Sequence, residues 1–471
     1  MQASHYDLFA HVSKETYDRE YRRISDSIAR PVDMLGAYRL FQPFAALAGM
    51  AHCNVGLPFQ QAYVPYVMGG GTVIPFDVTF AGNEVFLWHI YSDNWEGKPG
   101  DRLIAINGRP IADVLDNIDR FISGDNVAMK RTNIETTGFP RLYWLAYGET
   151  KTFALALQRA DGTCSELKVY AVPAMQFEQK QAANKPFINS SREIKFIGAT
   201  AYLRPGVFLN NQASGNLSVQ DTFNRGEFIQ FLDAAFLDIA TRKPRSLIID
   251  LRGNPGGDNS FSDPMVAYFA DKPFRFCSRF EMKTSEVTKG FWKDLADPAL
   301  AGLKEKILTH ANGKRFPVDV PLYQPRAGAE RFHGKVYVLV DRFTYSNATI
   351  VAALVQDYHF GVIVGEPTAD TPTTYGAAHQ FDLPHTKFTV MYRNKAELLA
   401  AGFEADSLKE DCPANSVFLR EGREVYHTYS AYARGLDTLH APNSFLDLTP
   451  YGRQEEWEDS PAGWPKQATF A

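Results

Sequence analysis

Hydrophobic positions along the chain alternate between helical spacing and short strand-like runs, and one stretch, residues 335–368, combines both. It begins with an apolar, β-branched run from Val336 to Val340, which is typical of a strand buried on both faces. After a polar break, apolar residues recur at helical spacing up to Asp357, and Val362 to Val364 predicts a second buried strand. The stretch therefore predicts strand, turn, helix and strand, with Ser346 in the turn.

Ser346 has two interpretations at this point. A serine at a helix start commonly accepts a hydrogen bond from a free N–H group and needs no chemistry. The turn at the carboxyl end of a buried strand is also where a reactive side chain meets the positive end of a helix, so Ser346 is equally a candidate nucleophile. The stretch alone leaves both open.

The N-terminal region has helical patterning over residues 15–50, where a charged segment gives way to an apolar one, and it predicts two or three helices. Ala51-His52-Cys53-Asn54 follows, then Gly56 and Pro58, which places His52 where a helix gives way to an extended segment. Taken alone, His52 is read as a structural histidine, and it becomes a candidate only in combination with other residues.

From Val73 the pattern changes to short alternating strands, VIPFDVTF and EVFLWHIY. The next segment predicts a strand from Arg102 to Ile106, a tight turn at Asn107-Gly108 and an amphipathic helix from Ile111 to Ile122. Strands are expected to continue through TFALALQRADGTCSELKVYAV. Residues 176–193 are polar and without pattern, and are expected to be a linker.

A second strong signal is the glycine-rich run that ends the strand SLIIDLRGNPGGDNS. The strand IGATAYLRPGVF and a helix within GEFIQFLDAAFLDIATRKP precede it, so a right-handed parallel unit is expected. No GK[ST] follows, which argues against a phosphate loop. An oxyanion hole fits better, with N–H donors from Asn347 and from Gly257, Gly256 being the fallback.

Composition limits the classes of function. The 471 residues are 45% hydrophobic and 22% charged, the length suggests roughly three domains, and the net charge of −5 argues against nucleic acid or an anionic membrane as the main partner. No apolar stretch reaches the length of a membrane span, so the chain is expected to be soluble. The four cysteines are far apart and predict free or buried thiols, not a metal site or a disulfide framework.

Two motifs carry resemblances to known families. KPGDRLIAINGRPI resembles the corresponding stretch of PDZ domains, although IPFDVT, where the carboxylate loop would lie, lacks the usual glycine pair and leaves capture of a C-terminus open. The order of helical segment, PDZ-like module, DLRGNPGG, serine-led helix and VGEPT resembles the tail-specific, or C-terminal processing, serine peptidases and their tricorn-like relatives, over roughly residues 15–406.

This family resemblance implies an α/β fold, with a ClpP/crotonase-like α/β-sandwich core, an N-terminal helical segment and an inserted PDZ-like β domain. The expected divisions are a helical segment over residues 1–68, the PDZ-like domain over 69–188, the peptidase core over 189–410 and a C-terminal extension of unknown role over 411–471.

The resemblance also implies the catalytic groups. The segment after GEPT contains no lysine, and Thr371 stands where the lysine base of the tail-specific branch would align, so a Ser-Lys pair is not expected. The tricorn-like branch uses a histidine from a stretch such as GDGHT, which GMAHCNV resembles, so His52 is the expected base. GFEAD resembles the family's GxEPD segment, which makes Glu404 the expected third member, while a solvated surface glutamate is the alternative. Glu366 is expected to be structural.

The expected activity is that of a serine-type endopeptidase, a hydrolase acting in proteolysis through Ser346, His52 and Glu404. Tyr345 and Tyr375 flank the site in sequence and are candidates for substrate binding. The expected partner is a peptide or protein substrate, no metal or other cofactor is implied, and an oligomer is left open. The family resemblance suggests a periplasmic or secreted location. A non-catalytic peptide- or ligand-binding protein on the same scaffold is the alternative function.

Overall fold

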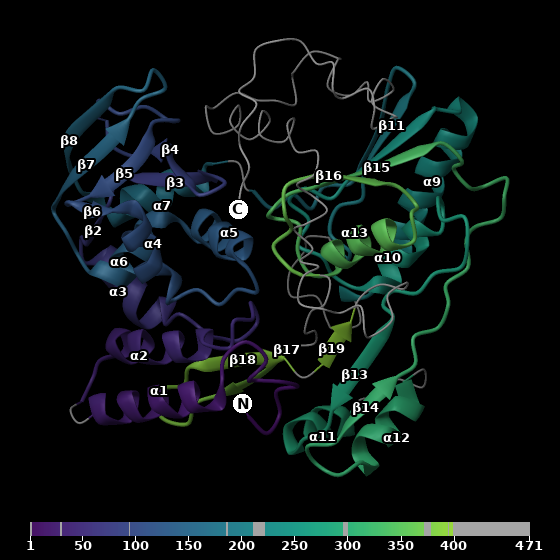
Figure 1. Cartoon of the computed structure of the whole chain (residues 1–471), viewed down its shortest axis with the longest axis horizontal. Coiled ribbons are helices and arrows are strands. Elements are labelled where there is room, and N and C mark those ends of the chain that lie inside the picture. Colours follow the sequence, from purple (N-terminus) through teal and green to yellow (C-terminus); the bar gives the residue numbers. More distant parts are fainter. Residues whose placement is uncertain are drawn as a thin grey trace.

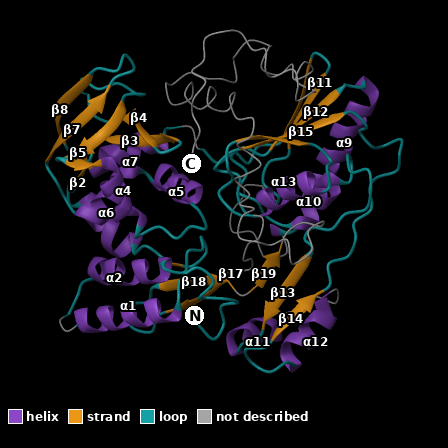
Figure 2. Cartoon of the chain, in the orientation of Figure 1, coloured by secondary structure: helices purple, strands orange, loops and turns teal. Residues whose placement is uncertain are grey.

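The computed structural model describes residues 2–28, 31–93, 95–184, 187–210, 222–294, 300–371, 378–393 and 395–398. Two lobes lie side by side, a β-rich lobe from the N-terminal half and an α/β lobe from the residues that follow (Figure 1). A smaller helix-and-strand layer lies below each lobe, as the colouring by secondary structure makes clear (Figure 2). The α/β class expected from the sequence is confirmed.

The layer below the β-rich lobe contains the predicted N-terminal helices. Ser13 and Asp33 cap the first two helices by accepting hydrogen bonds from the backbone N–H groups of Thr16 and Gly36. A short three-stranded sheet in the order β1-β18-β17 packs beside them. The elements are α1 (Lys14–Ser27), α2 (Met34–Ala46), β1 (Asn54–Val55), η1 (Phe59–Tyr63), α3 (Val64–Met68), β17 (Ala378–Asp382) and β18 (Thr389–Arg393).

The β-rich lobe is an antiparallel sheet in the order β3-β4-β5-β7-β8, with β6 paired to β5 and helices packed against it. The predicted strand, turn and helix from Arg102 onward are confirmed. The elements are β2 (Thr72–Val73), β3 (Phe76–Ala81), β4 (Glu84–Ile90), β5 (Arg102–Ile106), β6 (Arg109–Pro110), α4 (Ile111–Asp119), α5 (Val127–Thr137), α6 (Phe139–Tyr147), β7 (Thr152–Gln158), β8 (Cys164–Tyr170), β9 (Val172–Pro173) and α7 (Ala174–Ala182).

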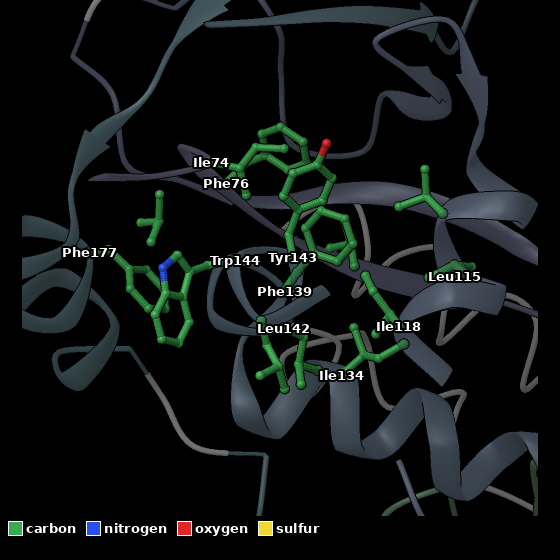
Figure 3. Close-up of a cluster of buried hydrophobic side chains, with 14 of the residues drawn as sticks. Ile74, Phe76, Leu115, Ile118, Ile134, Phe139, Leu142, Tyr143, Trp144 and Phe177 are labelled. Carbon is green, nitrogen blue, oxygen red and sulfur yellow. The ribbon is translucent and has the colours of Figure 1, made fainter. Parts of the chain in front are cut away.

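The core of this lobe is rich in aromatic side chains (Figure 3). Phe76 stacks on Phe139, and both are fully buried. The same core extends outside the lobe to Tyr38 of α2 and to Phe388 beside β18, whose rings meet edge to face. The N-terminal helices and the sheet β1-β18-β17 are therefore packed onto the β-rich lobe through one continuous apolar core.

The α/β lobe is built on a five-stranded sheet in the order β10-β11-β12-β15-β16. β11, β12, β15 and β16 are parallel, as the sequence predicts for β11 and β12, and β10 is an antiparallel edge. Side chains of α9, α10 and α13 pack on one face of the sheet. The elements are β10 (Glu193–Ile197), β11 (Thr200–Arg204), α9 (Gly226–Arg242), β12 (Ser246–Asp250), α10 (Asn259–Val266), β15 (Lys335–Val340), α13 (Asn347–Asp357) and β16 (Val362–Gly365).

An insertion between α10 and β15 forms the layer below the α/β lobe (Figure 1). Its strands β13 and β14 pair with each other, and β19, which lies after β18 in the chain, pairs with the other edge of β13. The small core of this layer contains Met282, Trp292, Ile307 and Phe316. The elements are β13 (Arg279–Lys283), α11 (Glu286–Lys293), α12 (Ala301–Thr309), β14 (Arg315–Val318) and β19 (Lys395–Leu398).

One prediction about secondary structure is wrong. The expected linker over residues 176–193 begins inside α7, which runs from Ala174 to Ala182. Phe177 is fully buried in the aromatic core, and Glu178 accepts hydrogen bonds from Tyr63 and Arg141. One buried ring and one partly buried ion pair hold this polar segment in place, and neither produces a hydrophobic period in the sequence.

Candidate active site

The turn between β15 and α13 holds Ser346 in an unusual backbone conformation, with φ 53° and ψ −126°. A residue other than glycine in such a region carries strain of about 1–3 kcal/mol, which persists only where the surroundings impose it. The Ser346 side chain makes no capping hydrogen bond to α13. The helix-cap interpretation of Ser346 is therefore wrong. Ser346 is half-buried at the start of α13, and its hydroxyl makes no capping hydrogen bond to that helix.

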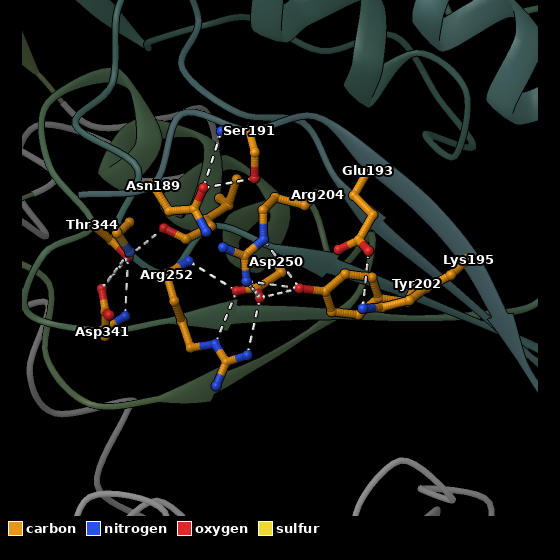
Figure 4. A network of polar contacts seen from close by, with 12 residues as sticks. Asn189, Ser191, Glu193, Lys195, Tyr202, Arg204, Asp250, Arg252, Asp341 and Thr344 are labelled. Carbon is orange, nitrogen blue, oxygen red and sulfur yellow. Dashed lines mark hydrogen bonds and ion pairs between the residues drawn. The ribbon is translucent and has the colours of Figure 1, made fainter. Parts of the chain in front are cut away.

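Hydrogen bonds between the turn and the loop after β12 maintain this conformation (Figure 4). The Asp341 carboxylate accepts from the backbone N–H groups of Phe343 and Gly253, each at 3.0 Å. The Thr344 hydroxyl donates to the carbonyl of Leu251 at 2.9 Å. The two loops that the sequence singled out are thus joined side by side at the carboxyl ends of neighbouring parallel strands.

The glycine-rich loop lies directly against Ser346. Gly256 has φ 92°, and a Cβ placed on it would lie 2.9 Å from Ser346 Cβ and 2.5 Å from the Tyr345 carbonyl oxygen. Asn254 fastens the loop, because its backbone carbonyl accepts from Tyr345 N–H at 3.0 Å and its side chain accepts from Gly256 N–H at 2.9 Å. Only glycine allows this approach of the two backbones.

The N–H groups predicted to form the oxyanion hole differ in whether they already make a hydrogen bond within the protein. Gly256 N–H is bound to the Asn254 side chain. Gly257 forms an isolated parallel bridge with Phe208. In this bridge Phe208 N–H donates to the Gly256 carbonyl, and the Phe208 carbonyl accepts from Asp258 N–H. Gly257 N–H takes no part in these two hydrogen bonds. The Asn347 side chain exchanges hydrogen bonds with Ser262 of α10, which fixes the residue that begins α13.

His52 reaches this site from the other lobe. It lies in the turn between α2 and β1, and both of its neighbours are bound to one loop, since Ala51 N–H donates to the Asp125 carboxylate at 2.9 Å and the Ser123 hydroxyl donates to the Cys53 carbonyl. Pairing of β1 with β18 fixes the following residues. The backbone of His52 is therefore held on both sides.

The His52 ring meets the residue next to Ser346 rather than Ser346 itself. His52 Nε2 and Tyr345 Oη share a hydrogen bond of 2.7 Å, and the ring centroids are 5.4 Å apart. Among the hydrogen bonds of the residues that the structure describes, none joins His52 to Ser346 Oγ. The structure brings His52, Tyr345 and Ser346 into one site, with the phenol bound to the ring nitrogen.

The phenol of Tyr345 keeps its proton. Burial raises the pKa of Tyr345 well above its usual value, and the negative charges of Asp370 and Asp125 raise it further, with a contribution from Cys53. A neutral phenol beside an imidazole can donate or accept a hydrogen bond, whereas a phenolate could only accept.

A buried ion network ties the turn to the β-rich lobe. Arg342 donates to both carboxylate oxygens of Glu135 in α5, at 2.6 and 2.7 Å, and to Glu366 at 2.8 Å. The Thr132 hydroxyl donates to the Arg342 carbonyl. Glu366 pairs with Arg342, in keeping with the structural role expected for it. No sequence pattern indicated that Glu135 would be the second partner of Arg342.

A second network supports the start of the glycine-rich loop (Figure 4). Arg252 and Arg204 both donate to the fully buried carboxylate of Asp250, which also accepts from the Tyr202 hydroxyl. Burial alone would raise the pKa of Asp250, but Arg252 and Arg204 outweigh it and lower the pKa to about 2. Asp250 is thus a permanent anchor for the loop and not a proton carrier.

The remaining predicted residues and groups divide as follows. Glu404 and Tyr375 lie outside the residues that the structure describes. Within the described ranges, no three His, Cys, Asp or Glu side chains gather as a metal site. Cys53 and Cys277 are buried, and Cys164 is exposed. None of the described helices combines the length and apolarity that crossing a membrane requires.

Two family models match parts of this chain. Residues 219–390 match Peptidase family S41, and residues 375–469 match a family described as a bacterial protein of unknown function, DUF899. No curated protein matches the chain. The resemblance to the tail-specific serine peptidases is confirmed, and the family match supports serine peptidase function.

Solved structures of one protein, CPAF, share the fold. A crystal structure of a CPAF serine-to-alanine mutant aligns with a TM-score of 0.58 at 13% identity, covering 92% of this chain and 93% of that one. Mature CPAF complexed with lactacystin aligns with a TM-score of 0.56 at 14% identity, covering 92% of this chain and 94% of that one. At this identity the likeness establishes the fold alone.

Proposed function

We propose that this chain, whose residues 219–390 match peptidase family S41, hydrolyses peptide bonds with Ser346 as nucleophile and His52 as general base. The observation that carries the proposal is the backbone of Ser346, which is held at positive φ between Gly256 and the start of α13. The Ser346 hydroxyl makes no capping hydrogen bond to α13. Strained positions of this kind cluster at active sites, and a nucleophile on a sharp turn from strand to helix is a recurring solution.

The proposed reaction needs the ring of His52 and two backbone donors. His52 Nε2 takes the proton from Ser346 Oγ as the oxygen attacks the peptide carbonyl, and returns it to the leaving amine, which leaves an ester on Ser346. Water then attacks this ester and gives a proton to His52 Nε2, which passes it to Ser346 Oγ as the acid product is released. Gly257 N–H and Asn347 N–H stabilise the oxyanion, because Gly256 N–H is bound to Asn254. Loss of one such donor typically raises the barrier by about 2.7–4 kcal/mol.

The finer parts of the proposal concern the substrate and the surroundings. We place the peptide or protein substrate across Ser346, with Tyr345 and Tyr375 beside it, cleavage within the chain of the substrate, and Glu404 as the third catalytic member. The PDZ-like module over residues 69–188, the remaining predicted domain boundaries and an extracytoplasmic location belong to the same proposal.

Hydrolysis of an unfolded protein substrate tests the proposal. The unmodified chain should produce new peptide ends, and Ser346→Ala and His52→Gln should each abolish them while keeping the thermal unfolding midpoint. His333→Gln is a matched control, because His333 is an exposed histidine in the α/β lobe. Cleavage that persists in Ser346→Ala would overturn the proposed function.

One observation favours the second candidate, a binding protein without catalysis. His52 Nε2 is bound to Tyr345 and not to Ser346. A scaffold that had lost its chemistry would retain the fold and the glycine-rich loop while the ring took another partner. Saturable binding of a peptide by Ser346→Ala, together with no cleavage by the unmodified chain, would identify this alternative.

A further inference from the structure

The hydrogen bond between Tyr345 and His52 occupies the atom on which the proposed reaction depends. A neutral imidazole has one nitrogen that donates and one that accepts, so Nε2 makes one hydrogen bond in the plane of the ring. If the phenol donates, the lone pair of Nε2 is taken; if Nε2 donates, it already carries a proton. In both tautomers, Nε2 cannot accept the proton of Ser346 Oγ while Tyr345 Oη lies 2.7 Å from it.

The surroundings restrict how this hydrogen bond can open. The backbone of Tyr345 is fixed, because its N–H donates to the Asn254 carbonyl at 3.0 Å and its carbonyl accepts from Ala348 N–H at 3.1 Å. The backbone on both sides of His52 is fixed by Asp125 and Ser123. Opening therefore requires rotation of a side chain, and the movement of a loop is not needed.

Tyr345 also lies where a substrate would arrive. It immediately precedes the proposed nucleophile, is half-buried, and so has a part of its side chain in contact with solvent. A peptide that places its carbonyl against Ser346 Oγ must pass beside the residue adjacent to Ser346 in the turn. The same event can thus displace the phenol and present Nε2 to the serine.

We propose that Tyr345 is a positioning residue that holds His52 Nε2 in the resting site and releases it to Ser346 Oγ when a peptide enters. This inference rests on the proposed function and adds to it a resting state in which the base is occupied. In this role Tyr345 affects catalysis by controlling whether His52 Nε2 is available, which is a different role from lining a substrate pocket.

The rate at which a fluorophosphonate probe labels Ser346 tests the inference, because the probe is too small to fill the site as a peptide does. Tyr345→Phe removes only the hydroxyl, so labelling should accelerate by about three- to tenfold, the worth of one net hydrogen bond. A substitution that merely damaged packing would slow it. Tyr337→Phe is the matched control, since Tyr337 is a buried tyrosine of β15 on the sheet face away from α13, and labelling should stay unchanged.

Nitrogen-15 NMR of labelled histidine supplies a second measurement that needs no activity. The Nε2 resonance of His52, assigned by its loss in His52→Gln, should shift in Tyr345→Phe and stay in place in Tyr337→Phe. An unshifted resonance, or labelling of Tyr345→Phe at or below the rate of the unmodified chain, would overturn the inference alone. No labelling of either chain would overturn the proposed function and the inference with it.

Discussion

Gly256 and Ser346 approach each other so closely that a methyl group on Gly256 would lie 2.9 Å from Ser346 Cβ. Their loops follow β12 and β15, two neighbouring parallel strands, and this contact brings the glycine-rich run to the proposed nucleophile. The geometry that makes Ser346 a candidate nucleophile therefore depends on the absence of one side chain.

Gly256→Ala is expected to abolish probe labelling of Ser346 and to lower the free energy of unfolding by about 1–3 kcal/mol, because alanine is strained at φ 92° and its Cβ meets the backbone of Tyr345. Gly290→Ala in α11 is the control, since a Cβ there meets nothing within 4 Å. Labelling and urea unfolding measure the two effects. Full labelling of Gly256→Ala would show that the contact does not shape the site.

Ser123→Ala is expected to lower kcat about tenfold and to leave KM nearly unchanged, because the Ser123 hydroxyl holds the carbonyl of Cys53 beside the base and lies away from the proposed substrate path. Steady-state hydrolysis of a fluorogenic peptide provides both constants. Ser27→Ala is matched to it, since the Ser27 hydroxyl also donates to a backbone carbonyl, that of Arg23, but on an exposed helix. If Ser123→Ala and Ser27→Ala changed kcat equally, Ser123 would have no specific role in positioning His52.

Arg342→Met is expected to lower the free energy of unfolding by about 3–5 kcal/mol, because it leaves the buried carboxylates of Glu135 and Glu366 without their partner. Chemical denaturation measures this loss. Arg242→Met, which breaks an exposed pair with Asp238, should cost about 0.5 kcal/mol or less. A small loss for Arg342→Met would mean that the link between the turn and α5 does not stabilise the fold.

Asp263 in α10 gives the fold a dependence on pH. Burial raises the pKa of Asp263 to about 7, the hydrogen bond from Asn259 lowers it in part, and the charge of Asp258 adds a smaller increase, while an unfolded aspartate has a pKa of about 3.9. Between these values the unfolded chain releases a proton that the folded chain keeps. The contribution of Asp263 is therefore complete below about pH 4 and is lost as the pH rises toward 7, at up to about 1.4 kcal/mol per pH unit.

Asp263→Asn is expected to reduce the pH dependence of the unfolding free energy by up to about 1.4 kcal/mol per pH unit, and denaturation curves collected from pH 4 to 7 would show it. Asp116→Asn, which changes an exposed carboxylate on α4, should leave the slope as it is. The slope that remains belongs to other acids with raised pKa values, such as Glu366 and Asp357, each at about 7. A slope as steep in Asp263→Asn as in the unmodified chain would contradict the assignment to Asp263.

Local pattern was enough to predict most of the fold that supports the site. The strand and helix on either side of Ser346, the parallel strand before the glycine-rich loop and the hairpin at Asn107 all follow from hydrophobic period and turn chemistry. The failure at α7 has a specific cause, because Ala174 and Phe177 are the buried residues of an otherwise polar helix and form no hydrophobic period that extends along it.

The contacts that complete the site were beyond such reasoning. His52 and Tyr345 are 293 positions apart, and only a family resemblance singled out this histidine among the others. The Arg342–Glu135 pair joins residues 207 positions apart. Charges and hydroxyls that meet across two lobes leave no period in the sequence, so their pairing becomes visible only in the structure.

Covalent labelling by a fluorophosphonate, located by mass spectrometry of peptides from the unmodified chain and from His52→Gln, tests the central claim most directly. The account predicts one modified residue, Ser346, in the unmodified chain and a labelling rate reduced by about a hundredfold or more in His52→Gln. Modification of Ser346 at equal rates in both chains would contradict the assignment of His52 as base. Absence of modification at Ser346 in a folded chain would contradict the assignment of the nucleophile.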